Sequence, residues 1–281
     1  GVQTCALPIY SGPYAGGTVG IIYNTTMVSE EITSWSALFD PRYSGQVLMI
    51  DNPRDAIGLA LKYLGYSQNT TDRAEIEAAY QVIADAFDAK VYQGLVMDGV
   101  FDKMEGGEAA IAVYYAGDYL TMYENNEDLA FVVPQEGSNR FMDAMCVLKN
   151  AANKANAEAF INFMCRLDIA TINAEYIWYT SPVEGVREAL ELDEVTDAVM
   201  YPDESILDSC EYFTNLPSDI LSYYDELCPL SERDMLGAML QMWGKCVGVD
   251  VVTRYGLKRQ LSNKMKGVAR GTHPHLSTCL A

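Results

Sequence analysis

Residues 46–65 read QVLMIDNPRDAIGLALKYLG: a short apolar run, a polar turn and then a longer amphipathic run. The first five residues lie between a glycine and an aspartate, which is typical of a strand buried on both faces. Apolar residues then recur at helical spacing, at Ile57, Leu61 and Leu64. Gly65 follows at the position where a glycine commonly ends a helix. The stretch therefore predicts a strand over 46–50, a turn, and a helix over 56–64.

The same alternation continues along the chain. Further apolar runs predict strands over 21–23, 110–115, 129–133 and 144–148. Thr33 is placed to cap a short helix that carries Trp35, and Asp72 with Glu75 resembles a capping box before a helical stripe. A long amphipathic helix is expected over 155–166. Strands that alternate with helices, without internal repeats, predict an α/β fold with a mostly parallel sheet.

The charge balance excludes some partners. The chain holds 19 Lys and Arg against 39 Asp and Glu, a net charge of −20, which argues against nucleic acid because the phosphate backbone attracts positive patches. An acidic surface that only keeps the protein soluble remains the alternative to a cationic ligand. No apolar run approaches the roughly 20 residues that a membrane helix needs.

Motifs for catalysis or metal binding are absent from the sequence. There is no Gly-rich dinucleotide or phosphate loop, no G-x-S-x-G and no H-E-x-x-H, and the two histidines, His273 and His275, lie near the end of the chain. The seven cysteines form no C-x-x-C pair, so neither a metal site nor a cofactor is expected. Cys146 and Cys165 lie in apolar segments and are predicted to be buried thiols.

Acidic and aromatic residues follow three of the predicted strands. Strand 46–50 runs into Asp51, Asn52 and Asp55, strand 110–115 ends in Tyr114 and Tyr115 before Asp118, and strand 129–133 leads to Phe141 and Asp143. In open α/β sheets, ligands bind beyond the carboxyl ends of the strands. Carboxylates beside aromatic faces suit a chain of ammonium groups, although each residue alone could serve in a turn or the core.

Several segments, in order, resemble the bacterial spermidine/putrescine-binding proteins, the solute-binding components of polyamine ABC transporters. They are SGPYAGGTVGIIYN (11–24), SWSALFDP (34–41), VLMIDNPRDA (47–56), ALKYLGYSQNTTD (60–72), VYYAGD (113–118), VVPQEG (132–137), FMDA (141–144) and AEAFINFM (157–164). The resemblance runs from about Tyr10 to Leu227. It implies an α/β, two-lobed periplasmic-binding-protein (type II) fold, with one lobe complete and the other missing its N-terminal part.

The resemblance also implies ligand-binding residues, namely Asn52, Asp55, Tyr115, Asp118, Phe141, Asp143 and Tyr179. Asn52 matches a position that is Asp in spermidine-preferring members, and Tyr115 one that is commonly tryptophan. Asp118 matches the acid of putrescine-preferring members. Asp51 has no counterpart among the amine-binding acids of the family.

The segments of the chain are assigned from the same resemblance. Residues 1–9, GVQTCALPI, resemble a translated sequencing adapter, which would explain the lack of a secretion signal. The expected domains are 10–23 as the first crossing between lobes, 24–131 as the complete C-terminal lobe, and 132–228 as the return crossing with the rest of the N-terminal lobe.

The tail, 229–281, is expected to lie outside the family. Residues 1–228 hold 11 basic and 36 acidic residues, whereas the tail holds 8 basic and 3 acidic residues, so the net charge changes sign. It is interpreted either as an artefactual extension or as a helical appendage that docks through Met235, Met239 and Met242.

The function implied is capture of putrescine or spermidine outside the cytoplasmic membrane and delivery to an ABC importer, without catalysis. The expected partners are the polyamine and the permease subunits, and the protein is expected to be a monomer that is periplasmic or lipid-anchored. Two alternatives stay open: a receptor for another small solute, such as an amino acid or an inorganic ion, and a carboxylate-dependent hydrolase.

Overall fold

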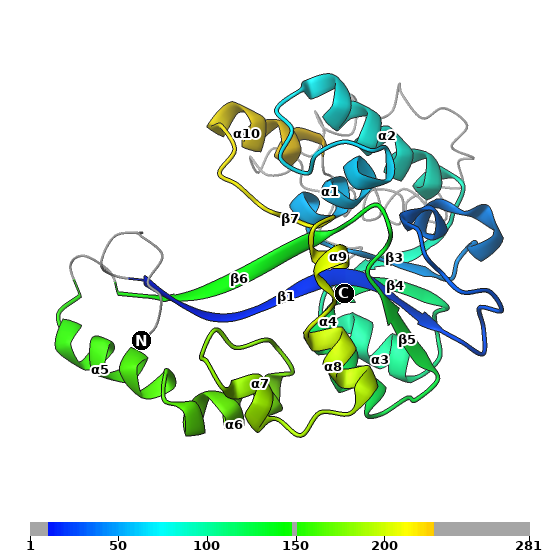
Figure 1. Cartoon of the computed structure of the whole chain (residues 1–281). Helices are drawn as coiled ribbons and strands as arrows, with labels where there is room; N and C mark the ends of the chain where they lie inside the picture. The colour runs from blue at the N-terminus through cyan, green and yellow to red at the C-terminus, as the bar shows by residue number, and fades with distance from the viewer. Residues whose placement is uncertain (1–10, 148–150, 228–281) are drawn as a thin grey trace, which may run out of the picture. The chain divides into compact units, whose positions relative to one another are not determined.

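The computed structural model describes residues 11–147 and 151–227, and Figure 1 shows their arrangement. The described residues have the α/β fold that the sequence predicted. The strands are β1 (Ser11–Asn24), β2 (Val47–Ile50), β3 (Tyr92–Val96), β4 (Ile111–Tyr115), β5 (Leu129–Val132), β6 (Asn139–Cys146) and β7 (Glu211–Tyr212).

The helices follow the strands in sequence and flank them in space. They are α1 (Pro53–Tyr63), α2 (Arg73–Asp88), α3 (Gly99–Glu105), α4 (Ala116–Tyr123), α5 (Lys154–Met164), α6 (Leu167–Ile177), α7 (Val186–Ala189), α8 (Glu194–Met200), α9 (Glu204–Leu207) and α10 (Ser218–Leu227), with 3-10 helices η1 (Trp35–Phe39) and η2 (Pro41–Tyr43). Helices α1, α2 and α10 lie on one side of the sheet, and α3, α4 and α8 on the other (Figure 1). Between these layers every residue of β2 is at most 1% exposed.

The sheet is mixed, so the prediction of a mostly parallel sheet is wrong. The strand order is β3-β2-β4-β1-β6-β7, with β5 also paired to β1. β2 runs parallel to β3 and β4, and β6 runs parallel to β7, but β1 is antiparallel to β4, β5 and β6. The predicted strand 21–23 is only the end of the 14-residue β1. Glycines at 12, 16 and 17 interrupt its apolar pattern and hide the rest.

β1 joins two parts of the described chain. Its second half pairs with β4 and β5 in the layered part, while Ser11–Thr18 pair with β6. Together, β1 and β6 extend from the layered part toward α5 and α6 (Figure 1). The predicted strand 144–148 is the end of β6, which begins at Asn139 because the first half of β1 offers it backbone partners.

Helix α1 ends close to its predicted end but begins at Pro53, three residues before the predicted start at residue 56. The Asn52 side chain accepts from the backbone N–H of Arg54 at 3.0 Å and caps the helix. Gly65 has a φ of +80°, and its N–H donates to the carbonyl of Lys62 while the next N–H donates to that of Leu61. This is the glycine-dependent helix end that the sequence indicated.

Two other helix starts differ from their predictions in detail. Ser34, and not Thr33, caps η1, because its hydroxyl accepts from the N–H two residues further on. Asp72 caps α2, but Glu75 does not complete the capping box. The Thr70 hydroxyl accepts from the Asp72 N–H and donates to Glu75 instead.

Burial near α5 is lower than the sequence predicted. The helix expected over 155–166 is present as α5, yet none of its residues is buried, and Phe160 is 59% exposed. Cys146 is exposed and Cys165 only partly buried, so the expectation of two buried thiols is wrong for Cys146. The β6 side chains around Cys146 face away from the layered core, which apolar composition alone does not reveal.

Some expectations fall on residues outside the described ranges. They concern residues 1–9 and the tail 229–281, which contains the three methionines named above and both histidines. Four cysteines also lie outside the described ranges, namely Cys5, Cys228, Cys246 and Cys279. Among the described residues, no helix is long and apolar enough to cross a membrane.

Candidate functional site

Three parallel strands deliver polar residues to one edge of the sheet. β2 leads into Asn52 and Asp55 at the start of α1, and β4 leads through Tyr115 into Asp118 in the first turn of α4. β3, which the sequence analysis missed, leads to Asp98. Because the carboxyl ends of parallel strands meet at the same edge, these side chains gather there.

Asp55 is a buried carboxylate held by uncharged donors. It is 3% exposed. The Tyr115 hydroxyl donates to its Oδ2 at 3.3 Å, and the Asn139 amide donates to its Oδ1 at 3.0 Å. Burial raises the pKa of Asp55 above its ordinary value, and these two hydrogen bonds oppose the rise.

Asp118 repeats this arrangement on the neighbouring strand end. It is half-buried, and the Tyr179 hydroxyl donates to its Oδ2 at 2.9 Å. Burial, with a contribution from the charge of Asp98, raises the pKa of Asp118. Burial and the nearby carboxylate raise the pKa of Tyr179 as well, so the phenol stays protonated and remains a donor.

Aromatic rings stand between the two carboxylates. Phe141 lies edge-on to Tyr115, with ring centroids 5.5 Å apart, and edge-on to Tyr179 at 5.8 Å. Tyr115 also meets Tyr114 at 5.0 Å. The rings come from β4, from β6 and from the segment after α6, so they form one wall across three elements.

Tyr179 is brought to this wall by two local features. Helix α6 ends at Trp178 with a left-handed φ of 57°, which turns the chain back toward β1. Thr180 then exchanges two backbone hydrogen bonds with Gly16, of 2.9 and 3.0 Å. At Gly17, next to this bridge, a Cβ would come within 3.1 Å of the Tyr179 ring and 3.2 Å of the Phe141 ring, so a side chain here would displace the rings by a few tenths of an ångström.

The structure brings six of the seven predicted site residues together and leaves Asp143 apart. Asp143 lies two residues beyond Phe141 on the same face of β6, is exposed, and forms no hydrogen bond or ion pair with a described residue. Asn52 lies beside the Tyr115 hydroxyl, but its side-chain oxygen also caps α1. Asp51, for which no binding role was expected, is exposed.

Three residues at the cluster were not among the predicted ligand-binding residues, although Tyr114 was noted at its strand end. Asn139 holds Asp55. The Tyr114 hydroxyl donates to Asp98 at 3.4 Å, and burial with two nearby acids raises the pKa of Tyr114 to about 12. Recognising the strand YQGLV (92–96) would have pointed to Asp98, whereas nothing in the sequence pairs Asn139 with Asp55 across 84 residues.

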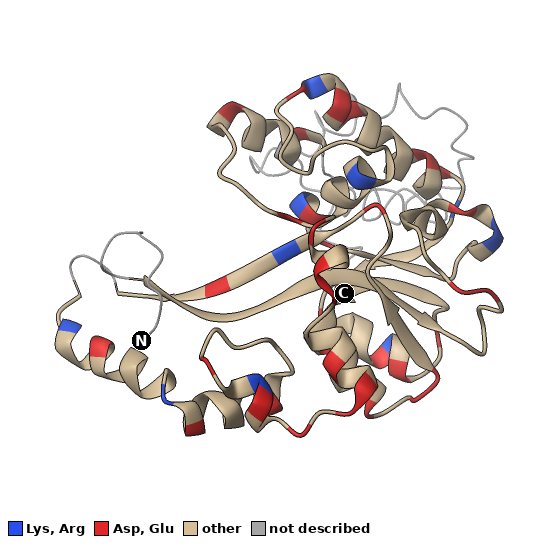
Figure 2. Ribbon diagram, viewed as in Figure 1, with Lys and Arg blue, Asp and Glu red and all other residues tan. Residues whose placement is uncertain are grey.

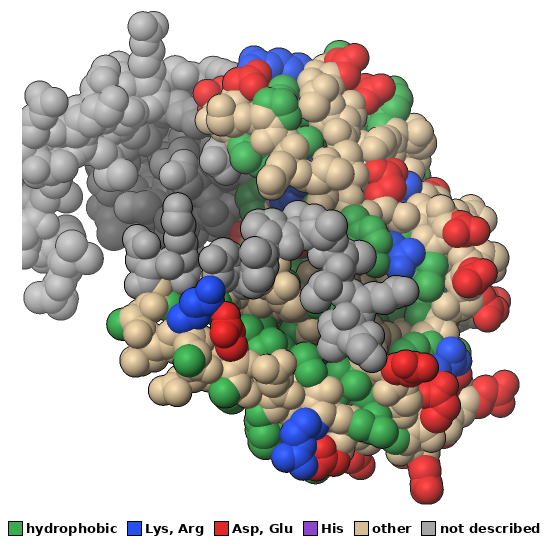
Figure 3. All heavy atoms as spheres, turned by 60° about the vertical axis from the view of Figure 1, so that its left-hand side comes forward, with side chains coloured by type: hydrophobic (Ala, Val, Ile, Leu, Met, Phe, Trp, Pro, Cys, Tyr) green, Lys and Arg blue, Asp and Glu red, His purple; other side chains and the backbone are tan. Residues whose placement is uncertain are grey.

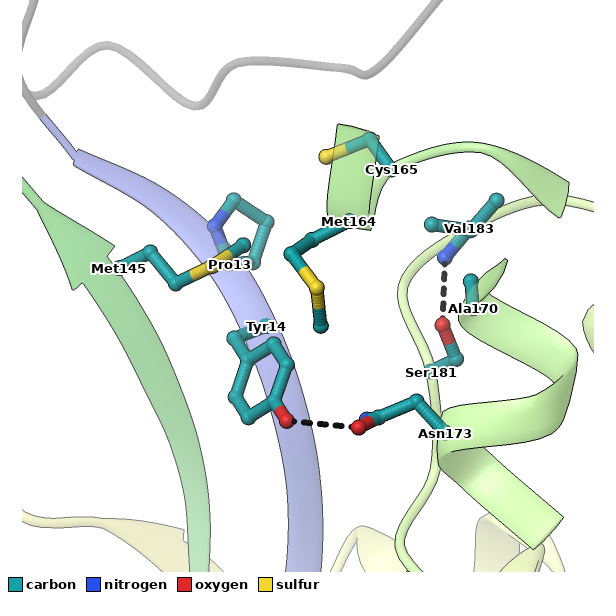
Figure 4. Close-up of a pocket in the computed structure, with 9 residues that line it drawn as sticks. All are labelled: Pro13, Tyr14, Met145, Met164, Cys165, Ala170, Asn173, Ser181 and Val183. Carbon is teal, nitrogen blue, oxygen red and sulfur yellow. Dashed lines mark hydrogen bonds between the residues drawn. The ribbon is translucent and has the colours of Figure 1, made fainter. Parts of the chain in front are cut away.

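Two cavities lie along β1 and β6, and the larger one is lined in part by Phe141 of the cluster. The smaller, of about 10 Å³, has room for about one water and is lined by Tyr14, whose hydroxyl donates to Asn173 at 3.0 Å (Figure 4). The larger, of about 330 Å³, is bordered by Arg140 and Arg187. Neither is lined by Asp55 or Asp118. Acidic side chains outnumber basic ones over the ribbon as a whole (Figure 2).

The fold and the cluster define a solute-binding protein, and the chain belongs to the family of bacterial extracellular solute-binding proteins, which it matches over residues 6–209. Among its relatives are spermidine/putrescine-binding periplasmic proteins. That of Salmonella typhimurium is 32% identical over 218 residues, which is 77% of this chain and 62% of the relative. That of Escherichia coli is 33% identical over 204 residues, which is 72% of this chain and 58% of the relative.

A solved structure agrees with these relatives. The spermidine/putrescine ABC transporter substrate-binding protein of Streptococcus pneumoniae is 34% identical, with a TM-score of 0.69, over 78% of this chain and 67% of that chain. The chain thus spans about 60% of the length of the two curated relatives named above.

Proposed function

We propose that the protein captures a polyamine, putrescine or spermidine, outside the cytoplasmic membrane and delivers it to the permease subunits of an ABC importer. The observation that carries the proposal is the pair of carboxylates, Asp55 and Asp118, each hydrogen-bonded by a tyrosine on either side of the Phe141 ring. The names of the similar proteins support this choice of ligand.

The chemistry of the cluster suits a ligand with separated ammonium groups. Both carboxylates have neutral partners, and burial makes their charge unfavourable until a cation arrives. Among the described residues, the cation beside Asp55 is Arg54, whose guanidinium lies over the rings of Phe213 at 4.5 Å and Tyr224 at 5.2 Å. An ammonium group would gain a charge-assisted hydrogen bond from each carboxylate, and about 0.5 to 2 kcal/mol from each aromatic face.

The role proposed is binding without catalysis, in a monomer without a cofactor, located in the periplasm or anchored to lipid. A receptor for an inorganic anion is disfavoured because the cluster presents acids and phenols instead of arginines. An amino-acid receptor and a carboxylate-dependent hydrolase are the alternatives that the experiment below distinguishes.

We also propose that residues 10–23 and the start of 132–228 are the two crossings between lobes, with 24–131 forming one lobe. The pairing of β1 with β6 supports this division. Side chains beyond the crossing strands support it too, since Phe160, Ile172 and Tyr176 are 59%, 63% and 85% exposed, as expected for a face that packs against further structure. Hydrophobic side chains are visible over the lower part of the described surface (Figure 3).

Calorimetric titration with putrescine, spermidine, an amino acid and sulfate tests the proposal. It is performed on this chain and on a chimera preceded by the N-terminal part of the Streptococcus pneumoniae protein, because affinity in a two-lobed receptor requires both lobes. We expect the chimera to bind a polyamine and neither the amino acid nor sulfate, and the chain alone to bind more weakly. Binding of the amino acid alone, or turnover of a glycoside that Asp118→Asn abolishes, would contradict the proposed function.

A further inference from the structure

Asn139 is a buried polar residue that the cluster does not need for packing. It is 4% exposed and begins β6, where its backbone pairs with Glu211 of β7. The preceding residue, Ser138, donates its hydroxyl to the carbonyl of Val19 at 2.6 Å, which fixes the start of the strand on β1. The Asn139 side chain is therefore held in one place while its amide reaches Asp55 at 3.0 Å.

The groups that face Asp55 come from three elements. Tyr115 from β4 donates to one carboxylate oxygen and Asn139 from β6 donates to the other, while Arg54 is its neighbour on α1. Arg54 also donates to Asn69 at 3.0 Å and lies over two aromatic rings, so it is engaged on its other side. The direct donors to Asp55 are thus uncharged.

The amide keeps this contact although its own oxygen is left without a partner. Asn139 Oδ1 is buried and accepts no hydrogen bond from any described residue. A buried acceptor without a donor destabilises the folded state. A leucine of similar volume would remove that unpaired oxygen, but it would also leave one oxygen of the buried Asp55 carboxylate without its donor. The contact with Asp55 therefore accounts for an asparagine at this position.

We infer that Asn139 is a positioning residue for ligand binding, which holds the Asp55 carboxylate beside the Tyr115 ring without supplying a charge that would compete with the ligand's ammonium group. The inference rests on the proposed function. Because a donor stabilises the ionised form, the Asn139 contact also limits how far burial raises the pKa of Asp55. Without it, Asp55 would bind its proton at higher pH and lose its attraction for a cation there.

The test compares the wild-type chain with Asn139→Leu and a matched control, Asn24→Leu. Asn24 is also buried, with 3% of its surface exposed, and is the last residue of β1, where its side-chain oxygen accepts from the backbone N–H of Thr26 in the following turn. Putrescine affinity is measured from pH 5 to 8. We expect Asn139→Leu to weaken binding roughly 10- to 100-fold at pH 7, as for the loss of a hydrogen bond to a charged group, and to move the acid limb of the binding profile to higher pH. Asn24→Leu should lower Tm without moving that limb.

A second readout separates this inference from the proposed function. The titration of the Asp55 carboxyl carbon, followed by NMR without ligand, should shift to higher pH in Asn139→Leu. If the wild-type chain and the chimera bind no polyamine, the proposed function fails, while this titration still decides whether Asn139 controls Asp55. An unchanged titration, or wild-type affinity with a wild-type pH profile, would overturn the inference. Should Asn139→Leu not fold, Asn139→Ala makes the same comparison.

Discussion

Asp55 is a charged side chain in a place where an uncharged one would be more stable. Burial raises its pKa, so the folded chain holds the proton to a higher pH than the unfolded chain does. Its contribution to stability is therefore fully present below the ordinary pKa of an aspartate, and it is lost as the pH rises through the raised value. A residue that weakens the fold at neutral pH is expected where binding requires the charge.

We predict that Asp55→Asn raises stability at pH 7 while it weakens polyamine binding. The new amide can donate to the free Oδ1 of Asn139 after that side chain turns over, and its oxygen can still accept from Tyr115. The gain should be on the order of 1 kcal/mol, or about 2 to 4 °C in Tm for a protein of this size, and should vanish near pH 4. Thermal unfolding at pH 4 and pH 7 measures it. A lower Tm at both pH values would show that the carboxylate is structural.

We predict that substitutions at Asp118, Asp143 and Asp51 weaken putrescine binding to different degrees. In the chimera, Asp118→Asn should weaken putrescine binding by roughly 30- to 4000-fold, because it removes one partner of a shielded charge pair. Asp143→Asn should weaken putrescine binding less than Asp118→Asn because Asp143 is exposed. Asp51→Asn should weaken it least. Titration of each variant measures the order. Equal, small losses at Asp118 and Asp143 would place the pocket on other residues.

At the scale of the elements, the packing between β1 and β5 depends on the lack of a side chain at Gly20. A Cβ at Gly20 would lie 2.3 Å from the Phe131 ring and 2.6 Å from the carbonyl oxygen of Val132. Both belong to the β5 region, so the strand pair has no room for a side chain at this point.

Gly20→Ala should therefore destabilise the protein by about 1 to 3 kcal/mol through overpacking. Gly94→Ala in β3 is the matched control, since its Cβ would meet nothing within 4 Å. That variant should change stability little. Urea unfolding of both variants measures the difference, and a neutral Gly20→Ala would mean that Phe131 can move aside.

Elements with a strong local pattern were predictable from the sequence, and those made by pairing were not. The end of helix α1 before Gly65 was predicted, whereas its start was predicted three residues too late because the cap at Asn52 was not recognised. The strand β6 contains Arg140 and Asp143, and it is a strand because its backbone pairs with β1 and β7. The same distinction holds at the site, where Asp55 and Asp118 follow strand ends in sequence but Asn139 reaches Asp55 only through the fold.

For the molecule as a whole, the tail 229–281 is predicted to be dispensable. The family match ends at residue 209, before the tail begins. A chain that ends at Cys228 should therefore unfold within about 2 °C of the full chain, an interval that corresponds to about 1 kcal/mol or less. Differential scanning calorimetry gives the comparison. A fall of several degrees would show that the tail stabilises the body.

The long strand β1 also sets the order in which the chain can fold during synthesis. Val19, Ile21 and Ile22 leave the ribosome early, yet their partners in β4 and β5 begin only at Ile111 and Leu129. At 5 to 20 residues per second, about 5 to 20 s pass before these partners are made. During that interval the most apolar part of β1 has no sheet to join, and it is available to chaperones that bind nascent chains.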